Sequence, residues 1–181
     1  QSLELLKELH ILTRDGKLNQ DSRRKLKQVY HLFQFIEPLM RQVMDEKGGL
    51  TLVDHGAGKS YLGFILYDLF FKVGGVPVEG KAGAAPAAAP GDASRAAPAL
   101  PSHIYGIETR DELVTKSREL AARLGFPAMS FLSLSVAQAI DSPLLPSQVD
   151  IVTALHACDT ATDDAIRFAL ARHARHVVLV P

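Results

Sequence analysis

Cysteine is almost absent from this chain, which has one such residue, Cys158, among its 181. A single thiol excludes an internal disulfide framework and suits a reducing compartment. Long apolar runs are absent too, since no uninterrupted stretch approaches the roughly 18 residues that span a bilayer. From these two absences we expect a cytoplasmic protein without a membrane partner.

Net charge is a third absence, because basic and acidic side chains balance to a formal charge of zero at pH 7. Such a balance argues against a protein that coats nucleic acid in general. The charges are unevenly spread, however, since residues 14–28 carry six basic side chains and two acidic ones. This basic stretch is a candidate RNA-binding surface, and the alternative is an ordinary solvated helix face.

The apolar composition, 47% of the residues, is sufficient for one sizeable core. Hydrophobic periodicity predicts helices over residues 2–12, 21–48, 59–72, 110–124 and 160–173, and strands over residues 50–54, 103–108, 129–134, 149–155 and 176–180. Thr109 and Glu112 have the spacing of a capping box at the start of a helix. Strands that alternate with helices predict an α/β fold with a mostly parallel sheet and right-handed crossovers.

Residues 74–102 differ in composition from the rest of the chain. Of these 29 residues, 20 are Ala, Gly or Pro, and none is aromatic. Such a segment lacks the side chains that would offset the entropy of ordering it, so we expect a disordered insertion. The predicted organisation is N-terminal helices at residues 1–48, followed by an α/β domain at residues 49–181 that contains this insertion.

The string LVDHGAGKSYLG, residues 52–63, contains GAGKS, the ending of a triphosphate-binding loop. That loop needs a further glycine five positions before Gly58, and Val53 stands there instead. Val53 also closes an apolar run that reads as a buried strand, so the turn can begin only at Asp54. An ATP or GTP hydrolase is therefore disfavoured.

Polar groups follow three of the predicted strands, at the edge where parallel sheets bind ligands. They are Asp54 with the glycines Gly56 and Gly58, Glu108, and the segment at residues 156–159. An acid that ends the second strand is placed to accept both hydroxyls of a ribose, which indicates an adenosine compound. Asp54 inside the loop repels a pyrophosphate but suits a ligand that carries an ammonium group.

These residues match a known pattern. The segment from Val53 to Gly58 resembles the first motif of class I S-adenosylmethionine (SAM)-dependent methyltransferases. Three strings, VDHGAGKSYLGF, YGIETRDELVTKSRELAARLGF and DIVTALHACDTATDDAI, also resemble the methyltransferase-like family that includes the catalytic half of the glutathione-S-transferase C-terminal-domain-containing protein. This similarity runs from about residue 23 to residue 181, interrupted by the insertion.

The resemblance implies a Rossmann-like, three-layer α/β/α fold and SAM as cofactor. It also implies a set of cofactor-binding residues, which are Asp54, Gly56, Gly58, Lys59, Tyr61, Glu108 and Ser135. Ser135 aligns with an acid that contacts adenine in many relatives, so the departure leaves the adenine contacts open. Because class I enzymes continue with further strands, we expect this chain to be a piece of a longer protein whose C-terminal strands are missing.

The acceptor of the methyl group should lie beside the fourth strand, where residues 156–159 follow. His156 is a candidate base, and the alternative is a histidine hydrogen-bonded at a strand end. Asp159 is a candidate catalytic residue, and the alternative is a helix N-cap. Cys158 lacks the proline context of thiolate methyltransferases and is more simply a pocket-lining residue. No metal site is expected.

The sequence therefore predicts a SAM-dependent methyltransferase whose acceptor is unknown, with RNA slightly favoured over protein. The alternative is a SAM-binding scaffold without catalysis. A stoichiometric SAM complex that transfers no methyl group to any RNA or protein fraction would favour the scaffold.

Overall fold

The computed structural model of the chain describes residues 3–9, 11–13, 15–17, 20–72, 102–155 and 160–180. The predicted insertion lies outside this part of the chain except for Ser102. Its disorder stays a prediction.

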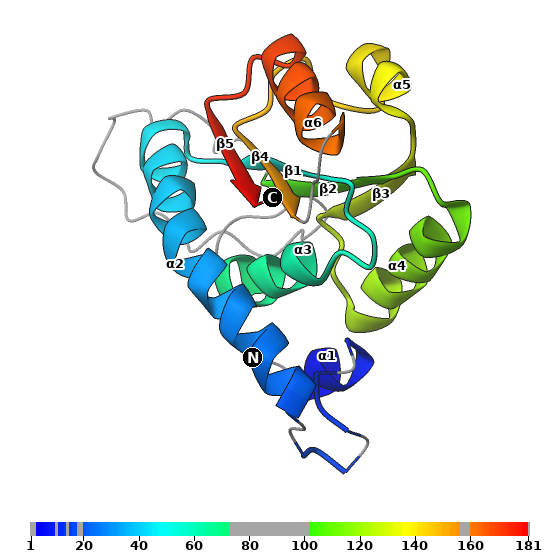
Figure 1. Ribbon diagram of the computed structural model, residues 1–181. Coiled ribbons are helices and arrows are strands. Elements are labelled where there is room, and N and C mark those ends of the chain that lie inside the picture. Colours follow the sequence, from blue (N-terminus) through cyan, green and yellow to red (C-terminus); the bar gives the residue numbers. More distant parts are fainter. Residues whose placement is uncertain are drawn as a thin grey trace, which may run out of the picture.

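Five parallel strands form one sheet in the order β3-β2-β1-β4-β5 (Figure 1). They are β1 (Thr51–His55), β2 (His103–Glu108), β3 (Met129–Ser133), β4 (Ile151–Leu155) and β5 (His176–Val180). Each β-to-β connection returns to a parallel register, so that Thr51 lies opposite His103 and Ile151 opposite His176. The chain moves outward from β1 to β3 and then restarts on the other side at β4, which makes the β1/β4 border the point where strand order reverses.

Helices cover both faces of the sheet (Figure 1). They are α1 (Leu3–Glu8), α2 (Gln20–Lys47), α3 (Tyr61–Leu66), the π-helix η1 (Tyr67–Lys72), α4 (Asp111–Leu124), α5 (Val136–Asp141) and α6 (Thr160–Ala171). α5 and α6 lie on one face, and α2, α3 and α4 on the other. The predicted three-layer α/β fold is confirmed. None of the described helices is both long and apolar enough to cross a bilayer.

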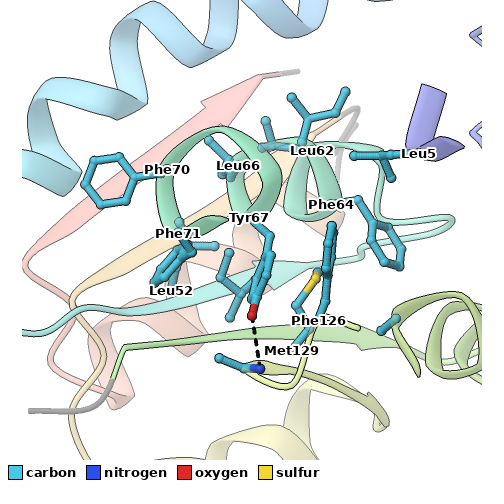
Figure 2. Packing of buried hydrophobic residues seen from close by; sticks show 14 of the residues in the cluster. Leu5, Leu52, Leu62, Phe64, Leu66, Tyr67, Phe70, Phe71, Phe126 and Met129 are labelled. Carbon is cyan, nitrogen blue, oxygen red and sulfur yellow. Dashed lines mark hydrogen bonds between the residues drawn. The ribbon is translucent and has the colours of Figure 1, made fainter. Parts of the chain in front are cut away.

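An aromatic cluster packs α3 and η1 against the sheet (Figure 2). The ring of Tyr67 stacks on Phe126 with centroids 4.3 Å apart, and Phe64 stacks on Phe131 at 5.5 Å. The Tyr67 hydroxyl accepts a hydrogen bond from the Ala128 N–H at 3.4 Å, so its polar end is satisfied inside the core. This packing anchors the helical segment that follows the glycine loop.

The N-terminal helices belong to the same core. Leu5 of α1 is 1% exposed, and Ile36 and Met40 of α2 are fully buried. All three share one hydrophobic cluster with Leu52 of β1. Burial of these side chains holds α2 along the sheet, where its N-terminal half can contribute to a site at the strand ends.

Two helix starts differ from the sequence-based expectations. The capping box predicted at Thr109 and Glu112 is wrong, because α4 begins after Arg110, which makes no side-chain cap hydrogen bond. The Thr109 hydroxyl instead faces the carboxylate that ends β2. A capping box is present at Ser135 and Gln138, at the start of α5. Periodicity missed α5 because six residues are too few to show a helical repeat.

Candidate cofactor site

The loop between β1 and α3 is a tight turn with left-handed backbone. Gly56 and Gly58 have φ angles of 67° and 56°, which glycine adopts without strain, and Ser60 has a φ of 50°. The Ala57 N–H donates to the Ile107 carbonyl at 2.9 Å. The loop therefore crosses the carboxyl ends of β1 and β2, which is the edge where parallel sheets bind ligands.

Asp54 lies beneath this loop and is 3% exposed. One carboxylate oxygen accepts a hydrogen bond from the Thr153 hydroxyl of β4 at 2.8 Å, and the other accepts one from the Ser60 hydroxyl at 3.4 Å. Burial raises the pKa of Asp54 to about 6, although both hydroxyl bonds lower it. A cation placed nearby would stabilise the ionised carboxylate. Asp54 is therefore suited to pair with an ammonium group.

Glu108 ends β2 and is surrounded by donors. Backbone N–H groups of Gly58, Thr109 and Arg110 donate to its carboxylate at 2.9, 2.9 and 3.1 Å. The Arg110 guanidinium adds two further bonds at 3.1 and 3.0 Å. The Arg110 side chain is the largest cause that lowers the pKa of Glu108, to about 2, and the backbone donors add to it. The carboxylate is thus ionised throughout the physiological range.

A cavity of about 680 Å³ opens at this edge of the sheet. Its volume falls within the range typical of small-molecule sites, roughly 300–1,000 Å³. Five of the predicted cofactor-binding residues line it together, and these are Asp54, Gly56, Gly58, Lys59 and Tyr61. Glu108 adjoins the cavity through its bonds to two of the lining residues, Gly58 and Arg110.

Ser135 has a different position from the other predicted cofactor residues. It is the N-cap of α5, where its hydroxyl accepts a hydrogen bond from the Gln138 N–H at 3.3 Å. Its own N–H donates to the Gln138 side chain at 2.8 Å. Ser135 is not among the residues that line the cavity. These two capping hydrogen bonds explain why a serine stands at this position, and no contact with a ligand is needed.

The predicted catalytic residues His156 and Asp159, together with Cys158, lie outside the described residues. The structure fixes the positions of the two elements on either side of this segment, β4 and α6. Leu155, at the end of β4, lines the cavity, and α6 begins at Thr160. The roles assigned to residues 156–159 stay predictions.

Helix α2 supplies a wall of the cavity that the sequence did not reveal. Gln28, Val29, His31 and Leu32 line it, one helical turn from the exposed basic side chains of the same helix. Periodicity identified the buried stripe of α2 but gave no sign that polar neighbours of this stripe face a ligand site. Only the packing of α2 across the strand ends brings them there.

His55, the last residue of β1, is a second polar group that the sequence reading passed over. It is 8% exposed, and its Nε2 has no hydrogen-bond partner among the described residues. Its ring lies 5.7 Å from that of Phe168 in α6. Burial lowers the pKa of His55, so the neutral imidazole is favoured at this strand end.

The sheet order places the chain in the Rossmann-like α/β class, and the sequence comparisons identify its family. Residues 24–82 and 93–181 match a family model described as a methyltransferase domain. This match covers well over half of the chain, and the chain therefore belongs to that methyltransferase family. No curated protein sequence matches it significantly.

Solved structures of WbdD share the fold. The bifunctional kinase-methyltransferase WbdD has a TM-score of 0.52 at 17% identity, over 82% of this chain and 28% of that chain. Monomeric WbdD gives 0.53 at 15% identity, over 82% and 30%. Magnesium protoporphyrin IX methyltransferase (ChlM) from Synechocystis PCC 6803, with bound S-adenosylhomocysteine (SAH), gives 0.48 at 14% identity, over 92% and 62%. The chain spans less than a third of the WbdD chains. The likeness to WbdD establishes the Rossmann-like methyltransferase fold and nothing further about activity.

Proposed function

We propose that the chain binds SAM in the cavity at the strand ends and transfers its methyl group to an acceptor. One observation carries the proposal, which is the pair of carboxylates Asp54 and Glu108 at the ends of neighbouring strands, joined by one glycine loop. Family membership supports the same conclusion.

The two carboxylates fit the two polar ends of SAM. Asp54 would face the ammonium group of the methionine part, because its buried carboxylate lacks a cationic partner among the described residues. Glu108 would accept the two hydroxyls of the ribose. Gly56 and Gly58 allow a ligand to approach the backbone, and Lys59 and Tyr61 line the same cavity. Because SAM has no phosphate groups, this loop does not need to bind a triphosphate.

SAM, when bound, supplies a methyl group already activated by its sulfonium. The acceptor atom would form its bond to the methyl carbon as the carbon–sulfur bond breaks, and the electron pair would return to sulfur. The protein contributes mainly position and alignment. We assign His156 as the base that takes the acceptor proton, and we assign Asp159 to the acceptor side of the reaction rather than to the cofactor.

We favour RNA as the acceptor. Arg23, Arg24 and Lys27 are exposed on α2, and Gln28 of the same helix lines the cavity. Phosphates held by these side chains would place a nucleotide near the cavity mouth. A protein acceptor is the alternative that the assay must separate.

Two narrower assignments belong to this proposal. Three strings support a relationship with the family of the glutathione-S-transferase C-terminal-domain-containing protein, namely the one that contains the glycine loop, the one that runs from β2 through α4 and the one that runs from β4 into α6. The single cysteine supports a cytoplasmic location.

The direct test measures SAH binding by calorimetry and methyl transfer with radiolabelled SAM. The labelled assay uses separated RNA and protein fractions as acceptors. His156→Ala should leave the affinity for SAH unchanged and lower transfer by about 10²-fold, the usual effect of losing an acid/base group. Stoichiometric SAH binding without transfer to either fraction would favour the scaffold, and an absence of SAH binding would refute the cofactor assignment.

A further inference from the structure

The carboxylate of Glu108 is saturated with hydrogen bonds in the ligand-free protein. Its Oε1 accepts from the N–H groups of Thr109 and Arg110, from the Thr109 hydroxyl and from the Arg110 Nε. Its Oε2 accepts from the Gly58 N–H and from the Arg110 Nη2. A carboxylate offers about four lone-pair positions, and these six contacts already share them. The two hydroxyls of a ribose therefore cannot be added while all six donors remain. Some present donor must leave before a ribose can bind.

The Arg110 guanidinium is the side-chain donor that can free both carboxylate oxygens, because the Thr109 hydroxyl contacts Oε1 alone. The backbone donors are fixed by the glycine loop and by the start of α4, whereas the Arg110 side chain can rotate away and is 62% exposed. It donates one N–H to each carboxylate oxygen, at 3.1 and 3.0 Å. The two adjacent hydroxyls of a ribose would present the same arrangement, with one donor for each oxygen.

We propose that Arg110 closes the ribose subsite in the ligand-free protein, and that an adenosine ligand enters by exchanging its two ribose hydroxyls for the two guanidinium donors. This inference rests on the proposed function, because it takes Glu108 as the ribose acceptor. Arg110 also lines the cavity, and its Nη2 would lie 3.8 Å from a Cβ placed on Gly58. Its guanidinium therefore occupies space beside the loop that the ligand needs.

A second carboxylate, that of Glu112, follows Arg110 two residues along the chain. Glu112 is exposed in the first turn of α4, and its charge raises the pKa of Arg110, although less than Glu108 does. Arg110 can thus move from one carboxylate to another without losing an anionic neighbour. The exchange lowers the affinity for the cofactor, and it also lowers the affinity for the product SAH, which must leave after each transfer.

The test is the SAH affinity of the full 181-residue chain and of four variants, measured by calorimetry at low and high salt. Arg110→Leu removes the competitor and should bind SAH about fivefold more tightly, the order expected for a partly exposed ion pair. Arg110→Lys keeps the charge but loses the two-pronged geometry, so its affinity should be intermediate. Glu112→Gln removes the alternative partner and should weaken binding by about twofold.

Salt gives an independent readout. Salt should act mainly on the partly exposed Arg110–Glu108 pair, because SAH is neutral overall and the proposed partner of its ammonium group, Asp54, is buried and therefore screened less. Wild-type affinity should rise with ionic strength, and that rise should be absent in Arg110→Leu. Arg41 provides the matched control, because it is 66% exposed and paired with one carboxylate, Glu37, outside the cavity lining. Arg41→Leu should leave both the affinity and its salt dependence unchanged.

The outcomes separate this inference from the function on which it rests. If wild type binds SAH and folded Arg110→Leu, checked by its thermal unfolding, binds it equally or less tightly, the closure by Arg110 is wrong and the cofactor assignment stands. If wild type binds no SAH, both fail. Tighter binding by Arg110→Leu without the loss of salt dependence would also overturn the exchange, because it would place the gain elsewhere in the cavity.

Discussion

Asp54, one residue before the end of β1, and Glu108, at the end of β2, lie on neighbouring strands of one sheet, but the structure gives these two carboxylates opposite electrostatic properties. Asp54 is enclosed by the loop, and from the described residues its carboxylate accepts two hydroxyl hydrogen bonds and no cation, so burial raises its pKa to about 6. Glu108 accepts backbone N–H groups and a guanidinium, which lower its pKa to about 2. The comparison shows that the donors around an acid decide its charge more than its place in the fold does.

The difference suits the two parts of one ligand. A carboxylate that titrates near neutrality gains most from a cation, because the cation both pairs with it and stabilises its ionised form. A carboxylate that is always ionised is a constant acceptor for neutral hydroxyls. Substitution of either carboxylate should change or abolish this difference in pKa.

The largest effect is expected from Asp54→Asn. Because the pKa of Asp54 is raised from 3.8 to about 6, its contribution to stability is present below about pH 4 and lost as the pH rises through 6. The asparagine stays neutral and keeps an oxygen for the Thr153 hydroxyl, so the variant should be more stable at pH 8 by up to about 3 kcal/mol. Urea unfolding at pH 4 and pH 8 measures this difference, and a variant less stable than wild type at pH 8 would contradict it.

Glu108→Ala should have the next largest effect, on the cofactor rather than on the fold. Loss of the carboxylate leaves polar partners unpaired, and the affinity for SAH should fall by roughly 1–3 kcal/mol. Calorimetry with SAH gives this value without knowledge of the acceptor. An unchanged affinity would remove Glu108 from the ribose subsite.

The pH dependence of Glu108 should have the opposite sign from that of Asp54. Because the pKa of Glu108 is lowered from 4.5 to about 2, its contribution to stability is present above about pH 4.5 and lost as the pH falls through 2. Glu108→Gln should therefore be less stable than wild type at pH 7 by about 1–2 kcal/mol, a cost typical of bonds to a charged group. Unfolding between pH 2 and pH 7 should show the gap closing at the acid end. A constant gap would mean that the loss is steric.

Ser135→Ala should have the smallest effect and marks the limit of the site. Loss of an N-cap hydroxyl costs about 1 kcal/mol of stability. The affinity for SAH should stay within about twofold, because Ser135 does not line the cavity. Thermal unfolding and calorimetry check the two parts separately. A tenfold loss of affinity would restore Ser135 to the adenine contacts that the sequence resemblance implied.

For two of the strands the sequence predicted the exact first and last residues. The predicted strands at residues 103–108 and 176–180 agree with β2 and β5, because short apolar runs bounded by turns leave few alternative registers. The helix predicted over residues 110–124 ends at the same residue as α4, which is followed by the left-handed C-cap Gly125. The single helix expected over residues 59–72 is instead α3 followed by the π-helix η1. Its apolar residues are buried nearly all round, so periodicity could not detect the change in winding.

Local chemistry was less reliable than periodicity where two polar groups compete for one partner. Thr109 and Glu112 match a capping box by spacing, but the carboxylate of Glu108 takes the Thr109 N–H and hydroxyl. The box at Ser135 and Gln138 has no such competitor and forms as its spacing allows. Residue spacing alone therefore does not decide whether a capping box forms. The outcome also depends on neighbouring groups that compete for the same hydrogen bonds.

By itself the sequence determined the α/β alternation, the turn that follows Asp54 and the acid that ends β2, because periodicity, glycine positions and residue type are local properties. Only the tertiary structure decided the rest of the site. The wall supplied by Gln28 and His31 exists because α2 packs across the strand ends. The opposite pKa shifts of Asp54 and Glu108, and the closure of Glu108 by Arg110, depend on burial and on donors brought from separate elements. Such properties are set by distances in space, which the order of residues along the chain does not specify.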